Sequence, residues 1–270
     1  MSDSKNQAKY PKLPDLGTRT DEIEIFAGPC SVESEEQFFE VAETLAGLGL
    51  RWVRGGAFKP RTNPHSFQGL GEEALQIMQA GGEKYGLKTL TEVMDSEHIS
   101  LVQRYCDGIQ VGARNFQNFS LLKNIGIATA KTNTMVLFKR GFAGTIAEWL
   151  AATEYITQHG NDNVVLCERG IRTYETATRF TLDISAVPVI HKQSLFPICI
   201  DVSHPAGQRD LVPSLAKAAV AAGADSLMIE VHPDPQTALS DGPQQLTPAQ
   251  FADLVGELRE LAAVLGKKIV

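Results

Sequence analysis

Residues 163–170 read NVVLCERG, a nearly continuous apolar run that ends in the charged pair Glu168 and Arg169. A short run of this kind, rich in β-branched residues, is typical of a strand buried on both faces, as in a parallel sheet. Similar stretches recur along the chain, and we predict the other strands at 23–28, 50–55, 87–93, 108–113, 135–140, 196–202 and 226–231.

Segments with the helical spacing of apolar residues separate these strands. The segment 34–48 opens with Ser34 and carries Gln37 three residues later, which is the pattern of a capping box. Thr247 is followed by Pro248, a helix cap followed by proline at the first helical position. We predict helices at 34–48, 71–85, 145–159, 210–222 and 247–265, and shorter ones after the third, fourth and sixth strands.

Strands that alternate with helices predict a parallel sheet. The right-handed crossover rule leaves an open doubly wound sheet or a closed barrel. Eight near-equal units over about 240 residues favour the barrel, and no strand is followed by G-x-G-x-x-G, which counts against a dinucleotide-binding sheet. We therefore predict an α/β fold, a single-domain (β/α)8 TIM barrel over 21–270, preceded by an N-terminal arm or disordered tail at 1–20.

Composition narrows the class of protein. The chain has 270 residues, of which 43% are hydrophobic and 21% charged, and these values exclude a disordered or fibrous chain. No apolar run reaches the ~18–20 residues of a membrane span, and the polar start predicts no signal peptide. The net charge of −7 argues against nucleic-acid and membrane partners. The four cysteines are far apart and form no C-x-x-C motif, so we expect a reducing, cytoplasmic environment.

Polar residues, nearly all of them charged, end or follow every predicted strand, where the active site of a barrel is built. Cations from the second, fourth, fifth and sixth strands would meet at one mouth. They would repel one another unless a multiply charged anion bound there or each paired with a neighbouring carboxylate. Arginine suits bidentate contact with phosphate or carboxylate, and the size of the group suggests more than one anionic substrate group. The cations are Arg54, Lys59, Arg61, Arg114, Lys139 and Arg169.

A second group follows the first, seventh and eighth strands, which become neighbours when a barrel closes. It consists of one thiol, one imidazole and two carboxylates, a mixed set that suits Mn, Fe, Co or Zn. Its members are Cys30, His204, Glu230 and Asp241. The alternative is that the cysteine is a small buried hydrophobe and the histidine only a hydrogen-bonding residue. The other three cysteines lie in apolar runs and are expected in the core, while His65 and His232 are placed where they could approach the site.

Seven stretches around these residues match one known family closely. They are GPCSVES, RGGAFKPRTNPHSFQGLG, QVGARNFQN, LFKRG, CERGIRTYETATRFTLDISAVP, DVSHPAGQRDLV and IEVHPDPQTALSDGPQQL. In them the sequence resembles the 3-deoxy-7-phosphoheptulonate synthases, in the subgroup that also contains 3-deoxy-8-phosphooctulonate synthase. The resemblance runs in order from about 25 to 267.

The resemblance implies a barrel that condenses phosphoenolpyruvate with erythrose 4-phosphate and water, the first step of the shikimate pathway of aromatic amino acid biosynthesis. It implies a divalent metal (Mn, Fe, Co or Zn) and no organic cofactor. The metal ligands implied are Cys30, His204, Glu230 and Asp241.

The same resemblance implies roles for the cations. Arg114 and Arg169 would face the phosphate of phosphoenolpyruvate, and Arg54, Lys59 and Lys139 would lie nearer its carboxylate. Arg61 and Thr62 match the pair that holds the aldose phosphate, and Glu92 matches a carboxylate near the attacking water. The catalytic residues implied are Lys59, Glu92, Lys139 and His204.

Several features separate the members of this family. KPRT at 59–62 is the heptulonate form, where octulonate enzymes read more like K-A-N-R, and Cys30 argues for metal dependence. Departures from the family pattern are KTNTM at 131–135, Val202 in place of a common proline, and Pro205-Ala206 in place of Ser-Gly. Condensation with arabinose 5-phosphate or a sugar of specialised metabolism therefore stays open, as does a non-catalytic barrel that binds a metabolite.

By analogy with the family, we expect a homodimer or homotetramer and a separate chorismate mutase as a candidate partner. The segment before the barrel is shorter than the ~40 residues below which a chain rarely folds alone. We therefore expect no fused regulatory domain and no strong inhibition of the isolated protein by aromatic amino acids or prephenate.

Overall fold

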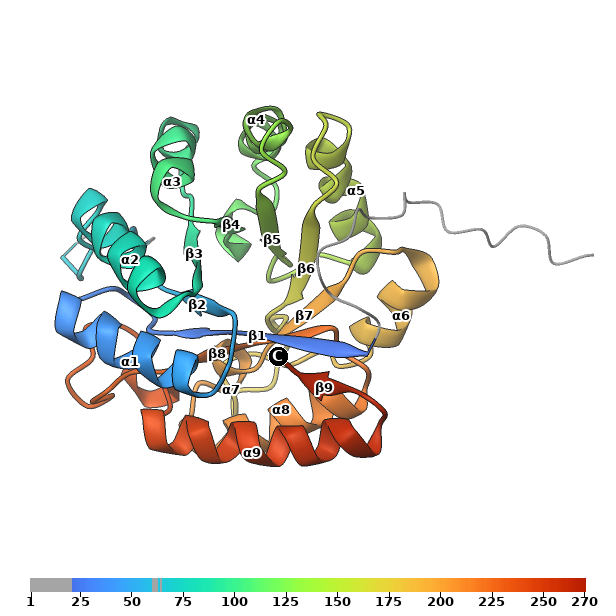
Figure 1. Ribbon diagram of the computed structural model, residues 1–270. Helices are drawn as coiled ribbons and strands as arrows, with labels where there is room; N and C mark the ends of the chain where they lie inside the picture. Colours follow the sequence, from blue (N-terminus) through green and yellow to red (C-terminus); the bar gives the residue numbers. More distant parts are fainter. Residues whose placement is uncertain (1–20, 60–62, 64) are drawn as a thin grey trace, which may run out of the picture.

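The strands form a closed parallel barrel (Figure 1). The computed structural model describes residues 21–59, 63 and 65–270. Strands β1 to β8 pair in chain order, and β1 pairs with both β8 and β2, so that the sheet closes on itself. The strands are β1 (Glu22–Gly28), β2 (Trp52–Arg54), β3 (Lys88–Glu92), β4 (Gly108–Val111), β5 (Met135–Lys139), β6 (Val164–Glu168), β7 (Ile198–Asp201), β8 (Ser226–Glu230) and β9 (Lys268–Ile269).

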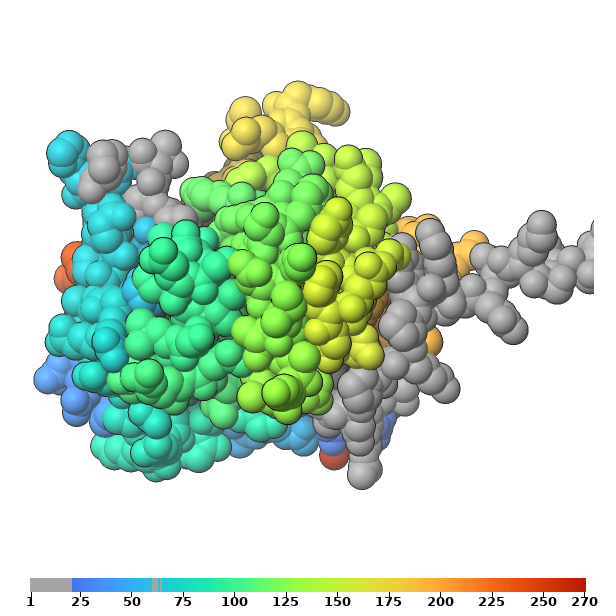
Figure 2. Space-filling model, turned by 90° about the horizontal axis from the view of Figure 1, so that it is seen from above, coloured from blue at the N-terminus to red at the C-terminus, as the bar shows by residue number. Residues whose placement is uncertain are grey.

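Helices surround the strands, which confirms the predicted (β/α)8 TIM barrel as a single domain. They are α1 (Glu35–Gly47), α2 (Glu72–Tyr85), α3 (Ile99–Tyr105), α4 (Phe119–Thr129), α5 (Ile146–Thr157), α6 (Ala186–Gln193), α7 (Ser203–Ala206), α8 (Val212–Ala221) and α9 (Pro248–Val264). In the space-filling view, the green to yellow-green segments that carry α3, α4 and α5 form a continuous wall (Figure 2). Among the described helices, none combines the length and apolar character needed to cross a bilayer. The predicted arm at 1–20 lies outside the described residues.

The helix starts agree with the sequence, with one correction. Ser34 accepts a hydrogen bond from the backbone of Gln37, as predicted. The Gln37 side chain, however, accepts from the backbone N–H of Glu33 instead of returning to Ser34, so only half of the predicted capping box forms. The full box occurs at Thr247, whose side chain and backbone exchange hydrogen bonds with Gln250.

The interior of the barrel changes from apolar to charged along the strands. Alternate residues of a strand point to opposite sides, so one set from each strand faces inward. The lower inward positions form an apolar cluster of Phe26, Trp52, Leu90, Met135, Leu137, Val165, Cys167, Cys199 and Met228. The next inward positions, towards the C-terminal ends of the strands, are polar. They are Arg54, Glu92, Gln110, Lys139, Arg169, Asp201 and Glu230.

The cysteine predictions for the core are confirmed. Cys167 and Cys199 belong to the apolar cluster inside the barrel, and Cys106 is buried after α3. All four cysteines are free thiols.

One charged cluster lies on the outer side of the strands and holds their ends together. Arg140 Nη1 lies 2.9 Å from Glu168 Oε2 and 2.8 Å from Asp183 Oδ2, and its Nε donates to the carbonyl of Gly144. Burial raises the pKa of Glu168, and Arg140 opposes that shift. The cluster therefore joins the end of β6 to the segments that follow β5 and precede α6.

Replacing Arg140 should destabilise the barrel strongly. Arg140→Leu leaves two carboxylates without their shared cation, and losing one partner of a buried pair costs about 3–5 kcal/mol. We expect a clear fall in the denaturant midpoint followed by circular dichroism. The matched control is Lys217→Met, since the Lys217–Glu257 pair is exposed on both sides and should contribute at most about 1 kcal/mol. Equal midpoints for the two variants would contradict this account.

Candidate active site

The polar inward positions open into a cavity of about 340 Å³ at the C-terminal ends of the strands. Most of the site residues predicted from the sequence line it. They are Arg54, Lys59, Glu92, Arg114, Lys139, Arg169, His204 and Asp241. Cys30 and Glu230 adjoin it through Asp241 and Arg54.

Four predictions need separate mention. Arg61 and Thr62 lie outside the described residues. His65 and His232 do not contribute to the cavity lining. The His232 imidazole is instead buried 3.4 Å from Glu33 Oε2.

Two of the cations pair with carboxylates, as the alternative interpretation of the group required. Arg54 Nη1 lies 3.3 Å from Glu230 Oε1 and donates to the Pro29 carbonyl at 2.6 Å. Lys139 Nζ lies 2.8 Å from Asp201 Oδ2. Burial is the largest influence on Lys139 and opposes its charge, but Asp201 and the weaker effect of Cys167 together hold the pKa of the lysine above its ordinary value. Both cations are therefore held in place at the cavity by buried carboxylates.

Arg169 differs from these two because it is buried without a counter-charge. Its side chain packs on the rings of Phe180 and Phe142, at 4.2 and 4.9 Å from their centroids. Its Nη1 is buried and has no hydrogen-bond partner among the described residues. An unsatisfied buried donor costs about 1–3 kcal/mol, and an anion in the cavity would satisfy it. Arg114 reaches the same ring of Phe142 from the exposed side.

Glu92 stands in the wall formed by β3 and β4. Gln110 Nε2 donates to Glu92 Oε2 at 3.0 Å. A β-carbon at Gly112 would lie 2.0 Å from Glu92 Oε1, so only glycine leaves room for the carboxylate in this position. The carboxylate is thus oriented from two sides at the edge of the cavity.

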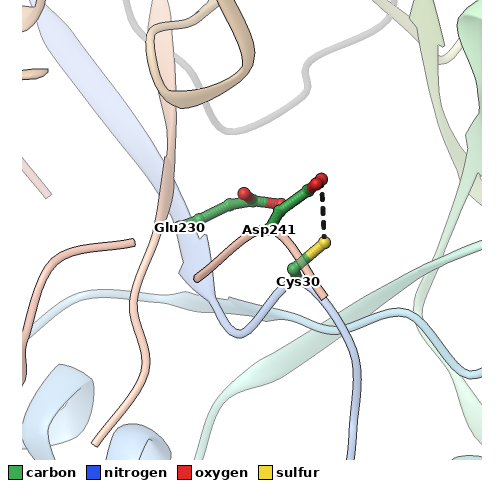
Figure 3. A group of neighbouring side chains, drawn as sticks. All are labelled: Cys30, Glu230 and Asp241. Carbon is green, nitrogen blue, oxygen red and sulfur yellow. Dashed lines mark hydrogen bonds between the residues drawn. The ribbon is translucent and has the colours of Figure 1, made fainter. Parts of the chain in front are cut away.

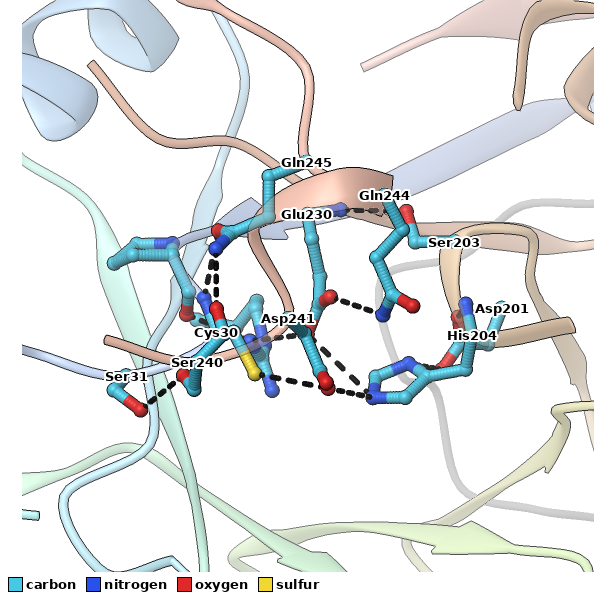
Figure 4. A network of polar contacts seen from close by, with 12 residues as sticks. Cys30, Ser31, Asp201, Ser203, His204, Glu230, Ser240, Asp241, Gln244 and Gln245 are labelled. Atoms are coloured by element: carbon cyan, nitrogen blue, oxygen red, sulfur yellow. Dashed lines mark hydrogen bonds and ion pairs between the residues drawn. The ribbon is translucent and has the colours of Figure 1, made fainter. Parts of the chain in front are cut away.

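Three of the four predicted metal ligands, Cys30, Glu230 and Asp241, lie together (Figure 3), and the fourth, His204, adjoins them (Figure 4). Ligand atoms of Cys30, Glu230 and Asp241 all lie within 4.8 Å of one another. His204 Nε2 lies 3.5 Å from Glu230 Oε1 and 3.8 Å from Asp241 Oδ2. A thiol, an imidazole and two carboxylates thus converge from the ends of β1, β7 and β8 and from the loop after β8.

The electrostatics of this group fit a divalent cation. Burial, followed by the charge of Glu230, raises the pKa of Cys30 to about 12. Burial lowers the pKa of His204, which favours the neutral imidazole that a metal binds. A bound divalent ion would deprotonate the thiol and compensate the two carboxylates. Lys59 Nζ, which lies 3.0 Å from Cys30 Sγ, would stabilise that thiolate further.

Asp201 connects the two halves of the site, and the sequence assigned it no role. One of its oxygens, Oδ2, lies 2.8 Å from Lys139 Nζ and 2.7 Å from His204 Nδ1. A carboxylate at Nδ1 leaves Nε2 free to face the metal ligands (Figure 4). Strand periodicity could have placed Asp201 at the site, because it lies two residues beyond Cys199, which points into the barrel. The structure also adds lining residues that sequence reasoning missed: Asn63, Ser66, Gln110, Phe142, Arg179 and Phe180.

Comparisons with known proteins agree on one family. The sequence model of the DAHP synthetase I family matches residues 16–265. A phospho-2-dehydro-3-deoxyheptonate aldolase of Thermotoga maritima is 52% identical over 245 residues, covering 91% of this chain and 71% of the relative. A 2-dehydro-3-deoxyphosphooctonate aldolase of Caulobacter vibrioides is 34% identical over 259 residues, covering 88% of this chain and 87% of the relative.

Solved structures agree with the sequence relatives. The crystal structure of the Thermotoga maritima phospho-2-dehydro-3-deoxyheptonate aldolase (DAHP synthase) superposes with a TM-score of 0.90 and 48% identity. The match covers 97% of this chain and 76% of that structure. A truncated form of the Thermotoga maritima 3-deoxy-D-arabino-heptulosonate 7-phosphate synthase has a TM-score of 0.88 at 47% identity, with 97% and 96% of the two chains covered.

Removing the thiol should remove the metal. Cys30→Ala takes away one of four donors, and we expect the dissociation constant for Mn²⁺, measured by competition with a chromophoric chelator, to rise at least roughly tenfold. Cys106→Ala is the matched control, because Cys106 is a buried free thiol outside the cavity lining. Equal Mn²⁺ affinity in the two variants would show that the thiol is not a ligand.

Proposed function

The chain belongs to the DAHP synthetase I family, and we infer that it condenses phosphoenolpyruvate with erythrose 4-phosphate and water to 3-deoxy-7-phosphoheptulonate and phosphate. This reaction is the first step of the shikimate pathway of aromatic amino acid biosynthesis. It needs a site that binds several anionic groups next to an electrophilic aldehyde.

One observation carries the inference: a buried, unpaired guanidinium and a four-residue metal donor set belong to the same site. Arg169 lines the cavity with Nη1 unsatisfied, and His204 and Asp241 line it as well. A barrel that only bound a phosphorylated metabolite would need the cations but not the adjacent thiol, imidazole and carboxylates. The pairing of the two groups therefore supports catalysis.

The cations bind and orient phosphoenolpyruvate in this proposal. Arg169 and Arg114, which lack carboxylate partners among the described residues, take its phosphate. Lys139, Arg54 and Lys59 lie nearer its carboxylate. Arginine gives bidentate contacts to such groups, and holding two charged substrates in line is worth several kcal/mol through proximity, about 7–11 kcal/mol in the best intramolecular cases.

The metal ligands are Cys30, His204, Glu230 and Asp241. A divalent ion held by them supplies Lewis-acid polarisation of the aldehyde oxygen. Asp201 Oδ2, at 2.7 Å from His204 Nδ1, would favour the tautomer with the proton on Nδ1, and Nε2 would then be available to an ion.

The bonds change in a defined order. The terminal enol carbon of phosphoenolpyruvate attacks the aldehyde carbon and a C–C bond forms. The aldehyde oxygen takes a proton, and we assign Lys59 Nζ as its donor. Water then adds to the phosphate-bearing carbon, and Glu92 accepts a proton from it. The resulting hemiketal phosphate breaks its C–O bond to phosphate, loses its hydroxyl proton and becomes the ketone. No organic cofactor takes part.

Arg61 and Thr62 are proposed to hold the aldose phosphate. The KPRT motif that contains them favours the four-carbon aldose. Relatives named as octonate aldolases are also similar to this chain, at 34% identity for the Caulobacter vibrioides protein. Arabinose 5-phosphate is therefore the alternative substrate that the assay must include.

Assembly and location complete the proposal. By analogy with the family, we propose a homodimer or homotetramer, with a separate chorismate mutase as a candidate partner. Four free thiols support a reducing, cytoplasmic environment. Sedimentation of the purified chain, with and without a chorismate mutase, tests the assembly.

The activity is tested directly by incubating the protein with phosphoenolpyruvate, Mn²⁺ and either aldose phosphate. We expect the enol absorbance to fall with erythrose 4-phosphate and one phosphate to be released per product. Chelator should stop the reaction and added metal should restore it. Turnover only with arabinose 5-phosphate would replace the proposed substrate, and none with any aldose phosphate would favour a binding protein.

Variants of the cations should separate the two substrates. Arg169→Met removes a charge-assisted contact worth about 1.5–3 kcal/mol, so the KM for phosphoenolpyruvate should rise roughly ten- to hundred-fold. Arg61→Ala should raise the KM of the aldose phosphate instead. Initial rates over both substrate concentrations give the two KM values, and equal effects of both variants on one substrate would refute this division of the cations.

A further inference from the structure

Each carboxylate of the proposed metal site uses its two oxygens differently. Glu230 Oε1 faces His204 Nε2 at 3.5 Å, while Oε2 accepts a hydrogen bond of 2.6 Å from Gln244 Nε2 (Figure 4). Asp241 Oδ2 faces Cys30 Sγ at 3.4 Å, while Oδ1 lies 3.2 Å from Arg179 Nη1. In both residues one oxygen faces the ligand group and the other is held from outside it, although Glu230 Oε1 also accepts a hydrogen bond of 3.3 Å from Arg54 Nη1.

The two outer contacts are joined by a single side chain. Gln244 Oε1 accepts a hydrogen bond of 2.9 Å from Arg179 Nη1. A continuous series of contacts therefore runs from Glu230 through Gln244 and Arg179 to Asp241. The loop between β8 and α9 supplies both Gln244 and Asp241, so these contacts also fix the shape of that loop.

The contacts require an amide at Gln244. Arg179 can only donate hydrogen bonds, so the carbonyl oxygen of the Gln244 amide must face Arg179. The Glu230 carboxylate accepts, so the –NH₂ group of the amide must face Glu230. Gln244 is 2% exposed and Glu230 is fully buried, so water does not readily replace the contact between them. A carboxylate at Gln244 would face Glu230 with like charge, and an apolar side chain would leave Glu230 Oε2 unsatisfied.

We propose that Gln244 is a positioning residue that keeps Glu230 and, through Arg179, Asp241 as one-oxygen ligands, and thereby sets the affinity and coordination geometry of the metal site. A carboxylate free at both oxygens can rotate and bind an ion through either or both of them. With its outer oxygen held, it presents one donor in one direction. Loss of such an outer contact typically weakens metal affinity roughly ten- to hundred-fold. This inference rests on the metal site of the proposed function.

Two neutral variants test it without changing the charge of the site. Gln244→Met keeps the volume of the side chain and removes both hydrogen bonds. Gln244→Asn keeps the amide but is one methylene shorter, so it cannot span both partners, and its polarity favours a folded protein if the first variant fails. Gln208→Met is the matched control, because within the described part of the chain the Gln208 side chain donates its hydrogen bond to the Ala177 carbonyl and to no proposed metal ligand.

Metal affinity and coordination are the measurements. We expect the Mn²⁺ dissociation constant of Gln244→Met, from chelator competition, to rise roughly ten- to hundred-fold, that of Gln244→Asn to rise less, and that of Gln208→Met to stay within twofold. The visible absorption of bound Co²⁺ should shift in both Gln244 variants and not in the control. The thermal stability of the metal-free proteins is measured in parallel.

The outcomes distinguish this inference from the proposed function. If the unmodified protein binds neither Mn²⁺ nor Co²⁺, the metal site itself is wrong and the inference falls with it. If it binds both ions, and the Gln244 variants lose stability but keep their affinity and the Co²⁺ spectrum, then Gln244 is only a structural residue. That result would overturn the inference and leave the proposed function intact.

Discussion

The two-residue period of a β-strand determines what this barrel can hold. Once eight parallel strands close, the inward positions become stacked layers that must be filled. Here Trp52, Leu90 and Cys167 belong to an apolar layer, and two residues further along each strand stand Arg54, Glu92 and Arg169. The apolar layer closes the barrel beneath the charged one. The charged layer can therefore exclude water from below while opening to substrate above, which is how a low-dielectric site strengthens its electrostatic contacts.

Much of this arrangement could be predicted because the periodicity of a strand can be recognised within a short stretch of sequence. Apolar runs that end in polar residues identified the eight barrel strands and half of the residues that line the cavity. Periodicity says nothing about irregular loops. Arg179 and Gln244 come from such loops, and their role depends on contacts with Asp241 and Glu230 across the chain. The same limit explains Gln37, whose side chain found a loop partner where the capping pattern predicted a helix cap.

The types of the residues also did not predict which cations of the cavity pair with carboxylates. The cations of the cavity divide into those that bring a carboxylate with them, such as Lys139, and those that do not, such as Arg169. The first kind is oriented before substrate arrives. The second has no carboxylate partner among the described residues, so an anionic ligand would supply its missing counter-charge. Removing a buried charge from water costs several kcal/mol unless it is paired. The carboxylate partners therefore distinguish two kinds of cation. Paired cations such as Lys139 position a ligand, and the unpaired Arg169 gains the most binding free energy from an anion.

Asp201 has a thermodynamic consequence for the site as a whole. Its Oδ2 touches Lys139 on the phosphoenolpyruvate side and His204 on the metal side. A change in the charge around either neighbour alters how Asp201 divides its interaction between them. Coupling free energies are reciprocal. If an anion bound at Lys139 changes the affinity of His204 for a cation by some factor, the bound cation changes the affinity for the anion by the same factor. Through this one carboxylate, the occupancies of the two halves of the cavity become linked equilibria.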